Sequence, residues 1–392
     1  MLKNSSSPVN LPIVKNNLTT IVESKVNDVF VFLEIFSQEG GIQSYVKDIL
    51  QAYTTLTTSR QGEVFLLRDS SEGDNPFEGD RMGFHYLKTS SPWLGRLNLI
   101  FSLIVFLWQN QPQRMFCGHI NLAPLIQLLC KLKGIPYTVL TYGKEVWEPL
   151  APNQKRALQQ ADEIWTISRY SRDRLCAAND INHQKVKFLY CAIDGEAFTP
   201  GVKSEELITR YGLESAQVLM TVARLWSGDI YKGVDVTIRA LPKIIEEFPQ
   251  VKYLVIGRGD DQPRLAKLAE DLGVAERVIF AGFVATEELV DHYRVADAYI
   301  MPSQEGFGIV YLEAMACGIP VLSGDSDGSA DPLQDGILGW QVPHRNPEAV
   351  AQACLEILRG EDQRCDGRWL REKSLAKFNY TAFKQRLQQL LG

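Results

Sequence analysis

The chain has 392 residues, of which 45% are hydrophobic, so it can bury two ordinary cores and is too long for one compact domain. Its net charge of −6 disfavours nucleic acid as the main partner. Seven scattered cysteines without a C-x-x-C pair, beside only five histidines, indicate reduced core thiols in a cytoplasmic protein and argue against a zinc site.

Residues 1–25 are rich in Asn, Ser, Thr and Val and contain no apolar run long enough for the core of a signal peptide. We expect a poorly ordered lead-in there. From residue 26 onward, short β-branched apolar runs alternate with longer amphipathic stretches, which is the signature of βαβ units and parallel sheets. In the first half, a helix is predicted over 42–56 after Gly40-Gly41, and strands are predicted over 29–33, 63–67, 84–87, 115–117, 137–140, 164–167 and 187–189.

Charge is unevenly distributed along the chain. Residues 1–200 carry +1 and residues 201–392 carry −7, but residues 81–191 hold 14 Lys and Arg against 6 Asp and Glu, a local +8. This stretch contains the apolar run Leu97–Trp108, which is too short to span a bilayer as a helix. A membrane-facing surface and an internal core helix beneath solvated charges both explain the pattern.

Breaks in periodicity place a domain boundary near residue 195, so we expect a first domain over 26–195 and a second over 196–368. Strands of the second domain are predicted over 218–222, 253–256, 278–281, 298–301 and 320–323, and the closing segment 369–391 has helical spacing. The predicted fold class is α/β with two doubly wound domains. Ligands of such sheets bind outside the carboxyl ends of the strands, so the cleft between the domains is the expected site.

The segment 302–322, PSQEGFGIVYLEAMACGIPVL, is the most informative part of the chain. Its glycines let the backbone approach a ligand, and the free amides and dipole of the following helix attract phosphate. Glu313 lies in an apolar run inside that helix, so the adjacent hydroxyls of a ribose are its expected partner, whereas Glu305 precedes the helix and can face a sugar. The alternative is that both are ordinary surface glutamates.

The pattern E-G-F-G, seven residues between Glu305 and Glu313, and then A-x-G-x-P-V resembles the retaining GT-B glycosyltransferases. The likeness is to the glycogen-synthase-like and phosphatidylinositol-mannosyltransferase-like type (glycosyl transferases group 1), over about residues 38–350. It implies two Rossmann-like domains, an acceptor-binding first and a nucleotide-sugar-binding second, with the C-terminal helix 369–392 crossing back to the first. It also implies donor contacts from Glu305, Gly306, Phe307, Gly308, Ile309 and Glu313.

Arg224 and Lys232 are similar to the two cations of the family's R-L-x-x-x-K-G segment, which neutralise the nucleotide diphosphate. A leaving diphosphate gains negative charge as the glycosidic bond breaks, so two fixed cations stabilise the transition state more than the ground state and can replace a metal. Surface cations near a helix start are the alternative. The segment 325–327 spells the D-x-D of metal-dependent glycosyltransferases, but we interpret it as a turn and expect no metal cofactor.

In the first domain, Gly41 in Gly40-Gly41-Ile42 resembles the family's glycine loop, which lies against the donor phosphate and the acceptor. His119 looks like the family's loop histidine near the donor sugar, and a purely structural histidine is the alternative. Tyr142 stands where the family usually has histidine, and Cys191-Ala192 stands where it has Asn-Gly. These departures concern the acceptor more than the donor.

The resemblance therefore implies hexose transfer with retention, with Arg224, Lys232, His119 and Glu305 as the catalytic residues. On family frequency we expect a UDP-hexose donor. The basic and apolar stretch favours a membrane lipid or long-chain alcohol as acceptor, at the inner face of a membrane, over a soluble or polysaccharide intermediate. A non-catalytic sugar-nucleotide-binding protein is the alternative class, and a nicotinamide oxidoreductase is disfavoured because no G-x-G-x-x-G opens a βαβ unit.

Overall fold

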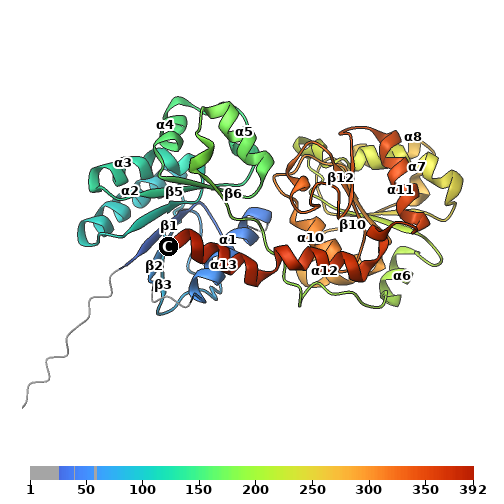
Figure 1. The fold of residues 1–392 in the computed structure, drawn as a ribbon, viewed down its shortest axis with the longest axis horizontal. Helices are drawn as coiled ribbons and strands as arrows, with labels where there is room; N and C mark the ends of the chain where they lie inside the picture. Colours follow the sequence, from blue (N-terminus) through green and yellow to red (C-terminus); the bar gives the residue numbers. More distant parts are fainter. Residues whose placement is uncertain (1–25, 39, 57–59) are drawn as a thin grey trace, which may run out of the picture.

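A computed structural model describes residues 26–38, 40–56 and 60–392. These residues form two parallel sheets, each with helices on both faces, which lie side by side (Figure 1). The predicted α/β class with two doubly wound domains is confirmed. The predicted lead-in, residues 1–25, lies outside the described residues.

The first sheet has seven strands in the order β3-β2-β1-β4-β5-β6-β7, all parallel. Its strands are β1 (Asp28–Phe32), β2 (Gly62–Leu66), β3 (Met82–Tyr86), β4 (Arg114–Cys117), β5 (Tyr137–Thr141), β6 (Glu163–Thr166) and β7 (Val186–Phe188). The interior strand β1 reads DVFVF and buries all five residues, as expected for a strand covered on both faces. The connecting elements are α1 (Gly41–Thr54), α2 (Pro92–Gln109), η1 (Ile120–Leu122), α3 (Ala123–Lys133), η2 (Lys144–Val146), α4 (Pro152–Gln160), α5 (Arg169–Asn179) and η3 (His183–Lys185).

The second sheet has six strands in the order β10-β9-β8-β11-β12-β13, also all parallel. They are β8 (Val218–Val222), β9 (Lys252–Ile256), β10 (Val278–Gly282), β11 (Ala298–Met301), β12 (Val321–Gly324) and β13 (Trp340–Val342). The other elements are α6 (Glu205–Tyr211), η4 (Ser227–Lys232), α7 (Val234–Glu247), α8 (Gln262–Asp271), η5 (Ala275–Arg277), α9 (Thr286–Val295), α10 (Ile309–Ala316), η6 (Gly328–Ala330), α11 (Pro347–Arg359) and η7 (Gln363–Cys365).

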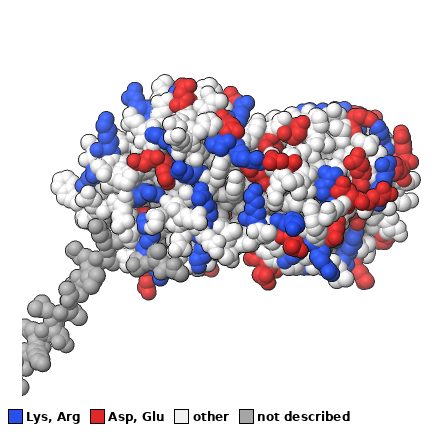
Figure 2. Space-filling model, in the orientation of Figure 1, with Lys and Arg blue, Asp and Glu red and all other residues white. Residues whose placement is uncertain are grey.

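Every strand predicted from the sequence overlaps an observed strand, and the predicted boundary near residue 195 falls between the two sheets. Strand β13, which has three residues, was not predicted from the sequence. Asp and Glu gather on the outer end of the second domain, which agrees with its negative charge (Figure 2).

The closing segment differs from the single predicted helix. It forms two helices, α12 (Gly367–Phe378) and α13 (Tyr380–Leu391), separated at Asn379, whose backbone is extended and whose side chain accepts a hydrogen bond from Ala382 N at 2.8 Å. Asparagine favours this N-cap role, so the chain ends one helix and starts another there. Helix α12 packs against α10 of the second domain and α13 packs against α1 of the first, so the segment bridges both domains (Figure 1).

Candidate active site

Loops from the carboxyl ends of both sheets meet at the boundary between the domains. In the loop after β5, Gly143 lies so close to Gly306, in the loop after β11, that a Cβ on Gly143 would come within 3.2 Å of Gly306 Cα. From the same first-domain loop, Lys144 Nζ lies 2.9 Å from the centre of the Tyr231 ring in η4. Open α/β sheets bind ligands at this edge, so the cleft between the domains is the candidate site.

Two predicted cations come together after β8. Arg224 and Lys232 line one small pocket of the second domain. Lys232 forms an ion pair with Glu305, and both side chains are largely buried, with 18% and 16% of their surface exposed. Arg224 Nη2 lies 2.8 Å from Asp229 Oδ2, while most of the Arg224 side chain stays exposed. The pocket therefore holds one largely buried cation, which is paired with Glu305, and one exposed cation, which is paired with Asp229.

The position of Lys232 depends on the glycine that follows it. Gly233 adopts a left-handed conformation with φ of 78°, and a Cβ there would lie 2.5 Å from the carbonyl oxygen of Pro302. Only glycine allows this turn and this close approach. The Lys-Gly pair thus packs the end of η4 directly against the chain that leads from β11 to Glu305.

The loop after β11 presents its residues in different directions. Glu305 faces Lys232, and Gly308 is the N-cap residue before α10, so the start of that helix lies beside the ion pair. Phe307 is buried, with its ring 6.0 Å from Tyr190 and 5.7 Å from Phe378. The Phe307 side chain is therefore part of the core, and only its backbone can contact a donor.

Glu313 lies further along α10, and its side chain is half-buried. The Tyr293 hydroxyl, in α9, donates a hydrogen bond to Glu313 Oε2 at 2.6 Å. Burial raises the pKa of Glu313, and the hydrogen bond from Tyr293 opposes that rise. The tyrosine fixes one carboxylate oxygen in position, which suits an acceptor of ribose hydroxyl hydrogen bonds. Tyr293 was not identified from the sequence, since a tyrosine on a helix has no distinctive pattern.

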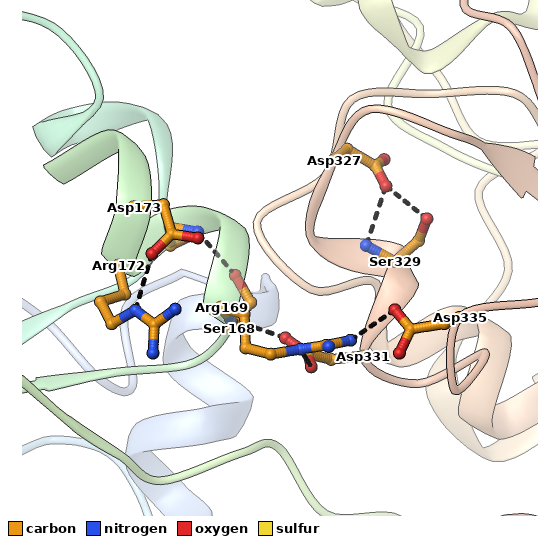
Figure 3. A network of polar contacts seen from close by, with 9 residues as sticks. Ser168, Arg169, Arg172, Asp173, Asp327, Ser329, Asp331 and Asp335 are labelled. Atoms are coloured by element: carbon orange, nitrogen blue, oxygen red, sulfur yellow. Dashed lines mark hydrogen bonds and ion pairs between the residues drawn. The ribbon is translucent and has the colours of Figure 1, made fainter. Parts of the chain in front are cut away.

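The segment 325–327 is a turn, as interpreted from the sequence. Asp327 is buried and accepts a hydrogen bond from the backbone N–H group of Glu305 at 2.7 Å. It accepts another from the backbone N–H group of Ser329 at 2.8 Å (Figure 3). Burial raises the pKa of Asp327 to about 7. Asp327 thereby holds the backbone of Glu305. The part of the chain that the structure describes contains no set of three or more His, Cys, Asp or Glu that could hold a metal ion.

An ion-pair network beside this turn joins the two domains. Arg169, at the start of α5, donates from its Nε to Asp331 Oδ1 at 2.5 Å and from its backbone N–H to Asp331 Oδ2 at 2.6 Å. Its Nη2 donates to Asp335 Oδ1 at 2.7 Å (Figure 3). Asp331 is buried, so this fork is a fixed contact that holds the second domain against the first. The sequence showed no sign of it, because the partners are 162 residues apart.

The first-domain residues lie on loops at the same sheet edge. Gly41 is the exposed first residue of α1, and a Cβ there would meet nothing within 4 Å. His119 follows β4, and its Nδ1 accepts a hydrogen bond from Asn121 N at 3.1 Å. Burial and the nearby charge of Arg68 lower the pKa of His119. The neutral ring therefore carries its proton on Nε2 and can donate it to a ligand.

Tyr142, which departs from the family pattern, has a structural role. Its side chain is buried, and its hydroxyl donates to the carbonyl oxygen of Gly118 at 2.9 Å. It thus supports the loop that carries His119. Within the described part of the chain, no hydrogen bond or ion pair joins His119 or Gly41 to the second-domain cluster of Arg224, Lys232 and Glu305.

Lys144 is the clearest functional candidate that sequence reasoning missed. Its position over Tyr231 brings a third cation to the cluster, and desolvation lowers the pKa of Lys144 while the neighbouring Glu305 opposes the change. A basic residue just after the carboxyl end of β5 was the available signal.

Comparison with known proteins identifies chains of similar sequence. The family model described as "Glycosyl transferases group 1" matches residues 216–360, which include all of the second-domain cluster. The GDP-mannose-dependent alpha-(1-6)-phosphatidylinositol monomannoside mannosyltransferase of Mycolicibacterium smegmatis is 34% identical over 337 residues, covering 82% of this chain and 86% of that protein. The protein of the same name from Mycobacterium tuberculosis is 33% identical over 343 residues, covering 83% and 87%.

Solved structures give the same fold. The crystal structure of Anabaena HepE in complex with UDP superposes with a TM-score of 0.75, covering 93% of this chain and 99% of that one, at 18% sequence identity. Such neighbours are glycosyltransferases of the GT-B fold, so the two facing domains described above have the GT-B architecture.

Proposed function

The chain belongs to the glycosyl transferases group 1 family, and we propose that it transfers a hexose from a nucleotide diphosphate sugar to the hydroxyl of a lipid-linked acceptor. The observation that carries the proposal is the ion pair of Lys232 with Glu305, which lies beside Arg224 and the start of α10 at the interdomain cleft. A cation, a carboxylate and a helix N-terminus in one place match the diphosphate and sugar of such a donor.

The donor that we propose is GDP-mannose. The two mycobacterial relatives are named as GDP-mannose-dependent enzymes, so they do not support the UDP-hexose expected from the sequence. In the second domain, Phe283 is exposed at the end of β10 and the Arg258 guanidinium lies 4.8 Å from the centre of its ring. An exposed ring beside strand ends offers a flat surface on which a nucleotide base can stack.

The reaction that we propose keeps the configuration at the anomeric carbon. The acceptor hydroxyl oxygen forms a bond to that carbon from the face on which the bond to the diphosphate oxygen breaks, and the hydroxyl proton passes to the departing diphosphate. Lys232 and Arg224 stabilise the charge that develops on the diphosphate, which makes a metal ion unnecessary. The Nε2–H of His119 and the carboxylate of Glu305 bind hydroxyl groups of the hexose from opposite sides of the cleft.

Domain closure is part of this proposal. Lys144 belongs to the first domain, and its contact with the Tyr231 ring exists only while the domains are together. The fork from Arg169 to Asp331 favours that closed arrangement. Closure around the donor would exclude water and bring the acceptor hydroxyl within reach of the anomeric carbon.

A lipid-linked acceptor is proposed because the relatives are named for phosphatidylinositol monomannoside. It would put the reaction at a membrane surface, and the seven free thiols of the described cysteines agree with a cytoplasmic side. The alternative acceptor is a soluble glycan intermediate, and the assay below compares transfer to it with transfer to the lipid.

The test is a transfer assay with GDP-mannose or UDP-glucose, with phosphatidylinositol-type lipid or soluble glycan, and with EDTA or Mg²⁺. We expect GDP-mannose and lipid to react in EDTA and to give an α-linked product by NMR. Turnover only with UDP-glucose or only with a glycan would overturn the donor or the acceptor, and a β-linked product would overturn retention. GDP binding without turnover for any acceptor would indicate a sugar-nucleotide-binding protein.

A further inference from the structure

The outward face of α2 is apolar. Nine of the fifteen large hydrophobic side chains exposed in the described residues lie on α2 and the neighbouring α3: Trp93, Leu94, Leu97, Phe101, Ile104, Val105 and Trp108 on α2, and Leu128 and Leu132 on α3. The two helices contact each other, so these nine residues form one surface, which we call the α2–α3 face. Trp108 is 82% exposed and Leu132 is 73% exposed. Soluble proteins seldom expose a large contiguous apolar patch unless it binds a partner.

The opposite side of α2 is part of the core. Gly95, Leu99, Leu103 and Leu107 recur every four residues and are buried against the first sheet. Helix α2 is the one described helix that is long and apolar enough to cross a membrane by length and composition, but it joins β3 to β4 and covers that sheet. Leaving the sheet would expose the core, so α2 can lie along an apolar surface but cannot span one. Of the two alternatives left open by the sequence, the core helix describes the inner side of α2, and the outer side has no partner among the described residues.

The charges around the face have one sign. Between Asp80 and Glu145 the chain has no Asp or Glu, while it has seven cations: Arg81, Lys88, Arg96, Arg114, Lys131, Lys133 and Lys144. Lys88 and Arg96 flank the start of α2, and Lys131 and Lys133 lie in the last turn of α3; all four are exposed, and none forms an ion pair within the described residues. In Figure 2 the edge of the first domain over α2 and α3 is white and blue.

This combination selects one kind of partner. A symmetric dimer through the α2–α3 face would place the same patch, with its unpaired cations, opposite itself, and like charges would repel. An anionic lipid surface instead offers apolar chains to the nine side chains and negative headgroups to the cations. Tryptophan near each end of α2 suits the boundary between headgroups and acyl chains.

We propose that the α2–α3 face docks the protein on an anionic lipid bilayer, with α2 lying in the plane of the interface. Because the sheet is parallel, α2 begins at the strand edge that also carries His119, so Trp93, Leu94 and Leu97 lie at the cleft end of the face. Docking through this face would bring the open edge of the first domain near the headgroups. The docking itself rests on surface residues and stands independently of the proposed reaction.

The test is flotation of the purified chain with vesicles of phosphatidylcholine, with and without phosphatidylglycerol, at low and high salt. We expect binding to the anionic vesicles that high salt weakens. The variant Trp93→Ser/Phe101→Ser/Trp108→Ser should bind at least tenfold more weakly, and Lys131→Gln/Lys133→Gln should lose most of the dependence on phosphatidylglycerol. The matched control, Val202→Ser/Ile337→Ser, removes two apolar side chains that are 93% and 61% exposed on the second domain and should bind like the wild type.

Circular dichroism and a thermal shift by GDP, measured on every variant, separate docking from folding and from donor binding. A wild-type chain that does not float at low salt would overturn the proposal, as would a triple serine variant that floats like the wild type. A concentration-dependent dimer that the serine substitutions abolish, without vesicle binding, would identify the α2–α3 face as a contact between copies instead. In each of these outcomes a GDP shift would leave the proposed donor site standing.

Discussion

Gly306→Ala tests whether the close approach of the two domains is needed for catalysis. Gly306 follows Glu305 in the second domain and faces the backbone of Tyr142 in the first. A Cβ at position 306 would lie 2.3 Å from the carbonyl oxygen of Tyr142, whereas real Cβ atoms stay beyond 3.0 Å. The obstacle is backbone and cannot rotate away, so the methyl group must push the loops apart.

The size of the effect follows from that distance. Relief of the contact requires a shift approaching 1 Å, and a misplacement of about 1 Å can cost roughly 10²-fold in rate. We therefore expect kcat to fall about 100-fold. Binding of GDP should change much less, because Arg224, Lys232 and Glu313 all belong to the second domain and move together.

The assay is release of GDP from GDP-mannose with the lipid acceptor, together with GDP binding by thermal shift. Gly73→Ala is the matched control, because its Cβ would meet nothing within 4 Å and its φ is not positive. A wild-type kcat for Gly306→Ala would refute the reasoning. Loss of GDP binding with kcat at saturating donor unchanged would show instead that the methyl group obstructs the donor.

Three further predictions concern single side chains. Lys232→Met should lower kcat by about 10²- to 10³-fold, whereas Lys203→Met, which removes an exposed ion pair of the same domain, should leave kcat unchanged; equal rates for both variants would contradict the proposed role of Lys232. Tyr293→Phe should raise the KM for the donor about tenfold in steady-state kinetics by releasing the Glu313 carboxylate, and an unchanged KM would remove that carboxylate from the donor site. Burial raises the pKa of Asp48 from 3.8 to about 7, so the folded chain keeps a proton that the unfolded chain releases, and the free energy of unfolding should fall as pH rises from about 4 to 7. Asp48→Asn should make this profile less steep in urea titrations, while Asp327, whose pKa is also raised to about 7, keeps its own contribution. An equal slope in both proteins would exclude Asp48 as a source of the pH dependence.

The strands and the donor motif were readable from the sequence because their signals are local. The composition of an apolar run such as 29–33 predicts a buried strand. The donor motif is equally local, because Glu305, Gly306, Gly308 and Glu313 lie within nine residues of one another. The fold class, the family and the position of the Arg224 and Lys232 cations all followed from patterns of this kind.

Contacts between distant segments required the folded chain. Lys144 and Tyr231 are apposed only when two separate sheets face each other, and Asp327 supports Glu305 across a reversal of the chain that no local pattern encodes. The break at Asn379 and the short strand β13 likewise depend on the surroundings into which the chain is packed.

Helix α2 shows the physical reason most clearly. Its sequence is apolar on nearly all sides, so periodicity cannot distinguish the side that packs from the side that does not. The sequence shows that this segment is mostly apolar and has no acidic residue. Only the sheet beneath it, which covers Leu99, Leu103 and Leu107 and leaves Trp93, Phe101 and Trp108 uncovered, decided which side chains remain for a partner, because burial is a property of neighbours and not of the residue itself.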